Sequence, residues 1–123
     1  MREYVPSGVI PAVLLPFHED LSIDEASYRA HLRDVASVEG ISALTVNAHA
    51  SEVASCSFDE QRRVLDIAQE EVGTHMPLVH GIYAEGSLEA ARIARMAHDG
   101  GASALLVSRP VESQLPQILC ADT

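Results

Sequence analysis

The sequence predicts an α/β fold in which parallel strands alternate with helices. Short apolar runs recur along the chain, amphipathic helical patterns separate them, and one strand-helix cycle takes roughly thirty residues. Strands that follow one another in this way run parallel and are joined by right-handed crossovers. The periodicity leaves two architectures open, a small doubly wound sheet and part of a closed βα barrel.

Four apolar runs are typical of strands buried on both faces, because apolar residues continue in them instead of alternating with polar ones. These runs are Val9–Leu15, Ala43–Val46, Leu78–Ile82 and Ala104–Val107. His80 falls inside the third run. We expect it to be a hydrogen-bonded structural histidine in preference to a catalytic one.

The first two helices are each expected to begin at a Ser-x-x-Glu spacing, Ser22–Glu25 and Ser57–Glu60. In this capping box the serine oxygen and the glutamate carboxylate satisfy free amide groups of the first helical turn. The first helix is expected to run to about Val38, and Gly40 and Gly73 are expected to follow the first two helices as stops.

A third helix is expected from near Ser87 to the pair Gly100-Gly101. After Pro110 the strand-helix repeat stops. The sequence therefore predicts one βα domain over residues 1–110 and an irregular surface tail over residues 111–123.

The charge of the chain excludes several partners. Its 123 residues include 18 acidic and 8 basic side chains, for a net charge of -10, and every basic residue is arginine. Phosphate backbones and anionic lipid surfaces repel such a chain, so we expect no nucleic-acid and no membrane partner. The two cysteines and the lack of an apolar signal segment at the N-terminus predict a cytoplasmic location.

Candidate chemistry lies at the carboxyl ends of the expected strands, where parallel α/β folds bind ligands. In the loop after the second run, His49, Ser51 and Glu52 supply a proton carrier, a hydroxyl and an orienting carboxylate. The alternative is that these short residues only make a sharp strand-to-helix connection. Cys56, before the second helix, is expected to be packed and inert.

No cofactor and no metal ion are predicted. The chain has neither a G-x-G-x-x-G motif nor a P-loop, which excludes the usual nucleotide sites. A metal-assisted lyase is a further hypothesis, but its candidate ligands have no recognised ligand spacing. These are His18, Glu19, His49, Glu52, His80 and Glu85.

Several strings of the sequence resemble one enzyme family, in the same order and over nearly the whole chain. They are Gly8–Phe17, Ser22–Asp24, Val46–Glu52, Pro77–Ile82 and Gly101–Val107. They look like the dihydrodipicolinate synthase and N-acetylneuraminate lyase family, with the likeness running from about Gly8 to Pro110.

The resemblance implies a TIM barrel and aldolase chemistry. Members of this family fold as eight-stranded βα barrels and condense or cleave 2-keto acids, usually pyruvate, through a Schiff base on a lysine of the sixth strand. A complete barrel needs about 250 residues, so the resemblance implies an N-terminal half with four strands, a truncated barrel. Since the chain has no lysine, we expect it to lack catalytic competence by itself.

The resemblance also assigns the loop after the second strand. The family has Gly-Thr-Thr-Gly-Glu there, whose threonines relay protons and hold the keto acid's carboxylate. His49 takes the first threonine position as a candidate proton relay, and Ala50, at the second, has no hydroxyl. Substrate binding is thus expected at His49, Ala50 and Ser51, with backbone amides receiving the carboxylate.

Other positions depart from the family. Leu15 replaces the threonine usual before Pro-Phe, and Val111 and Glu112 stand where the family has tyrosines. These departures predict a divergent branch with a different keto-acid substrate, or relaxed function.

The expected partners follow from an incomplete barrel. One hypothesis is an aldolase fragment completed by a second polypeptide. The alternative is a non-catalytic half-barrel that associates with its own copies as a binding or assembly module. The first rests on the collinear family motifs together with the missing lysine. The second rests on the open sheet edges and the apolar inner face that four parallel strands would leave.

Overall fold

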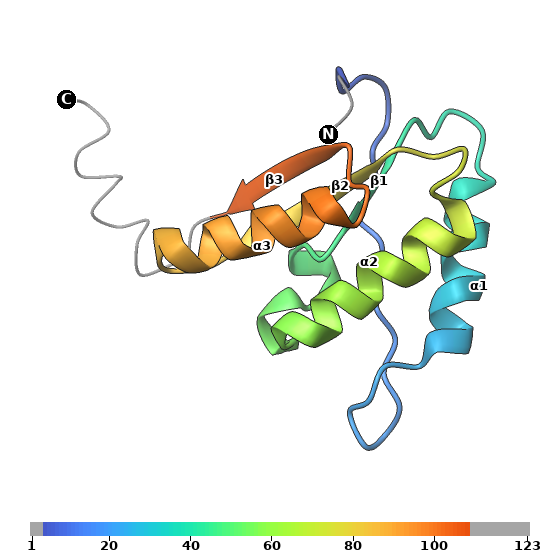
Figure 1. Cartoon of the computed structure of the whole chain (residues 1–123). Helices are drawn as coiled ribbons and strands as arrows, with labels where there is room; N and C mark the ends of the chain where they lie inside the picture. The colour runs from blue at the N-terminus through green and yellow to red at the C-terminus, as the bar shows by residue number, and fades with distance from the viewer. Residues whose placement is uncertain (1–3, 109–123) are drawn as a thin grey trace, which may run out of the picture.

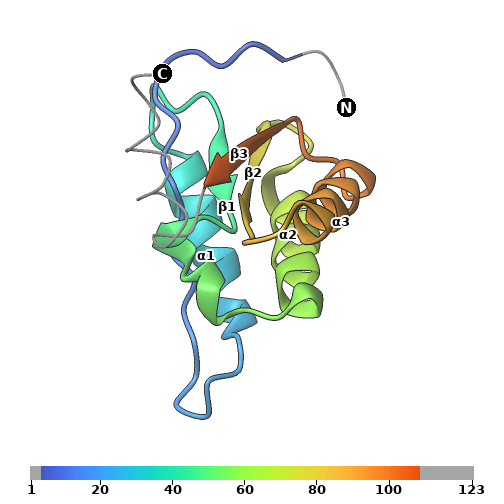
Figure 2. The ribbon, with the colours of Figure 1, turned by 90° about the vertical axis from the view of Figure 1, so that its left-hand side faces the viewer.

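The computed structural model describes residues 4–108, in which three helices alternate with three parallel strands. The sheet has the order β1-β2-β3, and each neighbouring pair is parallel. The helices follow one another across the molecule in chain order, and α2 and α3 lie on the same side of β2 and β3 (Figures 1 and 2). The α/β class is confirmed. The elements are α1 (Glu25–Ala36), β1 (Leu44–Val46), α2 (Phe58–Val72), β2 (Leu78–Tyr83), α3 (Ser87–Asp99) and β3 (Ala104–Ser108).

The first apolar run is extended chain beside β1, and the prediction of a fourth strand there is wrong. Residues 9–15 make only isolated parallel bridges, Val9 with Ile41 and Ala12 with Thr45. The Val13 amide donates to the Thr45 carbonyl (3.0 Å), so the odd-numbered amides of the run face β1. Pro11 occupies one of these positions and has no amide hydrogen, which interrupts the ladder.

The opposite edge of this run is partly closed by a side chain. Because Val13 points its amide at β1, the next amide, that of Leu14, points away from the sheet. It donates to Nε2 of His31 on α1 (3.0 Å). An imidazole thus takes a hydrogen bond that another strand would take in a wider sheet.

The register of the strands separates two faces of the sheet. One face packs against the helices and forms the core, because its side chains share a cluster with those of α1, α2 and α3. On this face lie Val13, Leu15, Leu44, Val46, Leu78, His80, Ile82 and Leu105. The other face carries Leu14 and Leu106, which are 59% and 47% exposed.

The start of α1 differs from the predicted one. The helix begins at Glu25, and its N-cap is Asp24, whose carboxylate accepts the Ser27 amide (3.1 Å). Ser22 lies in a turn closed by an antiparallel bridge between Phe17 and Ile23, and it bonds the Asp20 carboxylate. The capping box expected at Ser22 does not form because this bridge holds the serine away from the helix.

The other two helices match their predicted boundaries. The capping box at Ser57 is formed: Oγ accepts the Glu60 amide (3.1 Å), and the Glu60 carboxylate accepts the Ser57 amide (2.9 Å). Gly73 is the C-cap of α2, as expected, and Gly100 is the C-cap of α3. Of the two Ser-x-x-Glu motifs, the one at Ser57 forms a capping box, whereas at α1 Asp24 takes the N-cap position instead.

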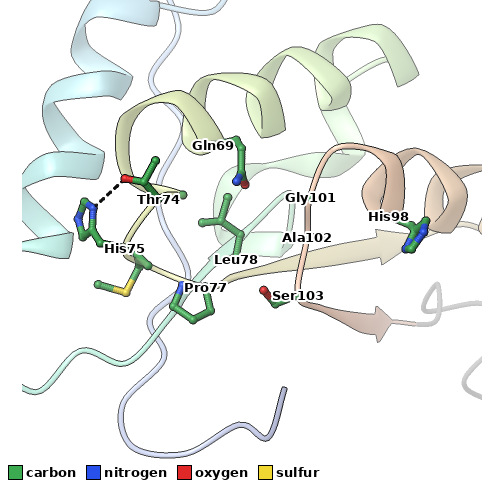
Figure 3. A pocket seen from close by; sticks show the side chains of 11 residues that line it. Gln69, Thr74, His75, Pro77, Leu78, His98, Gly101, Ala102 and Ser103 are labelled. Atoms are coloured by element: carbon green, nitrogen blue, oxygen red, sulfur yellow. Dashed lines mark hydrogen bonds between the residues drawn. The ribbon is translucent and has the colours of Figure 1, made fainter. Parts of the chain in front are cut away.

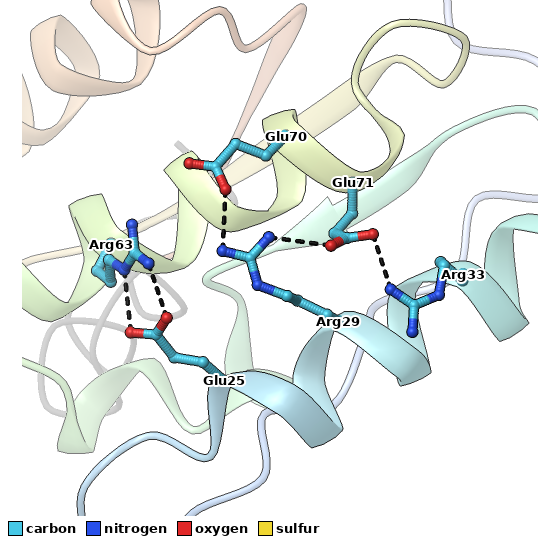
Figure 4. A network of polar contacts seen from close by, with 6 residues as sticks. All are labelled: Glu25, Arg29, Arg33, Arg63, Glu70 and Glu71. Atoms are coloured by element: carbon cyan, nitrogen blue, oxygen red, sulfur yellow. Dashed lines mark hydrogen bonds and ion pairs between the residues drawn. The ribbon is translucent and has the colours of Figure 1, made fainter.

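Ion pairs join α1 to α2 along their length (Figure 4). Arg29 donates to both Glu70 and Glu71 at 2.9 Å, and Arg33 donates to the second oxygen of Glu71 at 2.9 Å. The hydrogen bonds from Arg29 and then Arg33 lower the pKa of Glu71 from its usual value. The Arg29–Glu71 pair is partly buried and the other two are more exposed. An exposed pair contributes little to stability by itself, but the three together align α1 with α2.

A further pair strengthens this alignment at the start of α1. Arg63 donates to the Glu25 carboxylate through Nε (3.0 Å) and Nη2 (2.7 Å), a bidentate geometry.

Within residues 4–108 no helix combines the length and apolar character needed to cross a bilayer. The predicted tail over residues 111–123 lies outside the described residues.

The capping box of α2 should be measurable in stability. Ser57→Ala removes the oxygen that accepts the Glu60 amide, and we expect it to lower the free energy of unfolding by about 1 kcal/mol in urea denaturation. The matched control is Ser87→Ala at the start of α3, where the N-cap is Gly86 and no side chain caps the helix. This control should change stability by less than about 0.5 kcal/mol. Equal losses in both variants would contradict the assignment.

Candidate functional site

The loop after β1 carries the residues predicted to bind substrate. Two short 3-10 turns follow the strand, His49–Ser51 and Val53–Ser55. The backbone is left-handed at Asn47 and at Glu52, each with φ of 55°. Asparagine adopts this conformation more readily than most residues do. The loop therefore turns sharply at the carboxyl end of the sheet, the end that holds ligands in parallel α/β folds.

The three predicted binding residues have different surroundings. His49 and Ala50 are exposed, whereas Ser51 is buried, with 1% of its surface exposed. The Ser51 hydroxyl donates to the Val13 carbonyl (2.6 Å), and the Ser51 amide donates to the Ala48 carbonyl (3.0 Å). Ser51 thus ties the loop to the first run, and the groups of this trio that face outward belong to His49 and Ala50.

An aromatic contact joins this loop to the end of β2. The His49 ring meets the Tyr83 ring edge to face, with 5.4 Å between ring centroids and 74° between ring planes. This arrangement suits the positive edge of one ring and the negative face of the other. Tyr83 has no predicted role in the sequence, and its only signal there is its position at a strand end.

Beneath the loop, a buried hydrogen-bonded group joins β1, β2 and α2. Nδ2 of Asn47 donates to the Gln61 carbonyl (2.8 Å) and lies 2.9 Å from Nε2 of His80. Nδ1 of His80 lies 2.8 Å from the Gly81 carbonyl oxygen. Because a carbonyl only accepts, Nδ1 carries the proton and Nε2 accepts from Asn47. His80 is the hydrogen-bonded histidine that was predicted; the part played by Asn47 was missed.

Burial determines the protonation of His80. The side chain has 0% exposure, and desolvation lowers its pKa to about 4, although the hydrogen bond to the Gly81 carbonyl acts in the opposite direction. The imidazole is therefore neutral at pH 7, as the acceptor role of Nε2 requires. A protonated ring would place an N–H against the Asn47 amide, which is also a donor.

Neither alternative chemistry finds support in the described part of the chain. Burial, and then the carboxylates of Glu60 and Glu52, raises the pKa of the Cys56 thiol, which favours the inert interpretation. Over residues 4–108, no group of three or more His, Cys, Asp or Glu side chains is close enough to hold a metal ion. The strand-end histidines and carboxylates of the metal hypothesis are not brought together.

Two cavities lie at different ends of the sheet. A polar one of about 360 Å³ lies at the amino ends of β2 and β3, where Gln69, Thr74 and Ser103 line it (Figure 3). This is the end of the strands opposite to the predicted site. The second, of about 430 Å³, is lined by Leu14, His31, Ala50 and Glu52 among others, and so it borders the predicted loop.

The low pKa of His80 predicts a pH-dependent stability. Between its usual pKa of 6.5 and its folded pKa of about 4, the unfolded chain binds one proton more than the folded chain. Stability is therefore fully present above pH 6.5 and is lost as the pH falls toward 4. We expect the free energy of unfolding to drop by about 2 kcal/mol between pH 7 and pH 5 in urea titrations.

The control for this prediction is His80→Gln, which takes up no proton in that range. Its stability should change much less between pH 7 and pH 5. Asp24 and Glu25, whose pKa values are lowered from 3.8 and 4.5 by hydrogen bonds from Ser27 and Arg63, act at lower pH and leave this window clear. The same slope in both proteins would refute the assignment.

Comparison with known proteins identifies the family of the chain. The profile of the Dihydrodipicolinate synthetase family matches residues 5–117. A 4-hydroxy-tetrahydrodipicolinate synthase of Salinibacter ruber is 36% identical over 103 residues, which are 84% of this chain and 34% of the relative. A probable 5-dehydro-4-deoxyglucarate dehydratase 2 of Streptomyces coelicolor is 37% identical over 117 residues, 95% of this chain and 36% of the relative. The chain thus spans about a third of the length of these relatives.

Solved structures agree with the sequence relatives. CdNal from Clostridium difficile, in complex with mannosamine, aligns with a TM-score of 0.76 at 27% identity, over 81% of this chain and 34% of that one. A 4-hydroxy-tetrahydrodipicolinate synthase from Methylacidiphilum fumariolicum SolV has a TM-score of 0.80 over 86% of this chain and 35% of its own; at 20% identity it shows the fold alone. The three parallel strands and their helices are therefore part of a TIM barrel, and the chain belongs to the dihydrodipicolinate synthetase family.

Proposed function

We propose that this chain forms the N-terminal part of a lyase or aldolase barrel that acts on a 2-keto acid such as pyruvate through a Schiff base. The observation that carries the proposal is the placement of His49 and Ala50, which are exposed after the carboxyl end of β1, with the His49 ring against Tyr83 of β2. These are two of the three loop positions, His49, Ala50 and Ser51, at which the family resemblance implies substrate binding. The family membership supports the same reaction class.

His49 is the proton relay in this proposal. Its imidazole is exposed, and histidine is the side chain that most often carries protons near neutral pH. Ala50 brings no hydroxyl, so the keto acid's carboxylate is received by the backbone there. Ser51 contributes by holding the turn in place, because its hydroxyl and its amide are already bonded to Val13 and Ala48.

Apart from the α-amino group, the nucleophilic amine has to come from outside these 123 residues. The chain has no lysine, and its arginines stay protonated and cannot attack a carbonyl carbon. The relatives are about three times as long as the matched region, and the additional strands would bring the lysine to the same end of the barrel. This chain alone is then a binding surface without its reacting group.

Imine trapping tests this function. The chain alone, incubated with pyruvate and borohydride, should keep its mass. Mixed with the remaining two thirds of the Salinibacter ruber relative, it should allow trapping on a lysine of that fragment. His49→Ala should slow trapping by about 100-fold, whereas Ala50→Gly, which keeps the backbone amide, should leave the rate nearly unchanged.

Two results would refute the proposal. One is a mass gain at an internal residue of the chain alone. The other is trapping on the complementing fragment at the same rate whether or not this chain is present.

A second candidate function is a self-associating module without catalysis. Specific apolar side chains favour it: Leu14 and Leu106 are 59% and 47% exposed on one face of the sheet, and Val107 is 69% exposed on the other. Water disfavours such a surface, and a second copy of the chain would cover it. Sedimentation over a wide concentration range should then show a dimer or larger species. A monodisperse monomer throughout would eliminate this function.

A further inference from the structure

We propose that Asn47 and His80 are positioning residues that hold the His49 ring against Tyr83, and so orient the proton relay at the end of β1. Its catalytic meaning rests on the proposed function, but the geometry can be tested without any substrate. Neither residue lines either of the two cavities described above. They act only through the loop that begins at Asn47.

The first step is the hydrogen bonding of the Asn47 amide. Its two Nδ2 hydrogens are both used, one on the Gln61 carbonyl of α2 and one on Nε2 of His80. The side chain is 1% exposed, so water does not compete for these bonds. A planar amide with both hydrogens engaged cannot rotate without losing one of them.

The second step is the tautomer of His80. Nδ1–H donates to the Gly81 carbonyl at 2.8 Å, which leaves Nε2 as the acceptor that faces Asn47. The His80 ring, which accepts the Asn47 hydrogen, is thus held in orientation by a hydrogen bond to its own strand, β2. Since β2 also ends in Tyr83, the anchor of the loop and the ring that His49 meets belong to one rigid element.

The third step is the close approach of the two backbones. A Cβ at Gly81 would clash with the Asn47 carbonyl oxygen and lie 2.9 Å from Cα of Ala48. The chain of the loop therefore lies directly on β2 at this point. Asn47 leaves this contact in a left-handed conformation (φ 55°), and two residues later the chain reaches His49.

The polar group is poorly suited to a purely stabilising role. Asn47 Oδ1 and Gln61 Oε1 are both buried without a hydrogen-bond partner. Unpaired buried polar atoms cost free energy, and two apolar side chains of similar volume would avoid that cost. Apolar contacts are not directional, whereas hydrogen bonds fix the orientation of the groups they join, and a positioned imidazole needs a fixed orientation.

Proton NMR of the full chain tests this inference. The Tyr83 ring shifts the His49 ring protons from their ordinary resonance positions, so this shift reports the contact directly. In His80→Leu, which keeps the bulk but removes the acceptor, we expect the shift to collapse toward the value of a free histidine. In His80→Gln, whose amide oxygen can accept from Asn47, most of the shift should return.

Two further variants keep the test decisive. Asn47→Gly removes the amide while allowing the left-handed backbone, and it should also abolish the shift, even where His80→Leu fails to fold. His75→Leu, at the opposite end of the strands, is the matched control and should leave the shift unchanged. A full His49 shift in folded Asn47→Gly would overturn the inference.

The outcome is separate from that of the proposed function. If the ring shift behaves as expected but no imine is trapped with a complementing fragment, the positioning stands and the keto-acid function falls. If trapping occurs and the shift is insensitive to Asn47 and His80, the function stands and the positioning role falls.

Discussion

The contact between Gly81 and the Asn47 carbonyl constrains most of the loop at the end of β1. With no side chain on residue 81, the loop backbone lies directly on β2, and the Asn47 amide reaches both His80 and α2. The parallel pairing of β1 with β2 sets this approach, since Val46 stands opposite His80. Any larger residue at position 81 would push the loop away from the strand that carries Tyr83.

Much of the fold could be predicted from local pattern. Helix α2 has both halves of a capping box and a glycine stop, and continuous apolar runs located β1, β2 and β3. Local pattern failed where another segment decided the outcome. Pro11 does not disturb the apolar pattern of its run, but it has no amide hydrogen to donate to β1, so only isolated bridges form there. Ser22 has the spacing of a cap, but the bridge between Phe17 and Ile23 assigns it to a turn.

The candidate site was predictable in place but not in detail. Strand ends are visible in the sequence, so the loop containing His49 and Ala50 could be named in advance. The sequence could not show which groups of this loop are exposed, because the Ser51 hydroxyl donates to the Val13 carbonyl, 38 positions away in the chain. The contact of His49 with Tyr83 and the pairing of Asn47 with His80 likewise depend on register between strands. The spacing of residues within one segment cannot predict contacts that depend on how two strands are aligned.

The hydrogen bond from the Leu14 amide to His31 makes the two borders of the sheet chemically different. A strand that joined alongside the first run would compete with a ring nitrogen already seated on that amide, so docking there begins with a side-chain rearrangement of α1. At the other border, Val107 of β3 is 69% exposed on the face of the sheet that packs against the helices. Pairing beside the first run would therefore carry the added cost of releasing the His31 ring from the Leu14 amide.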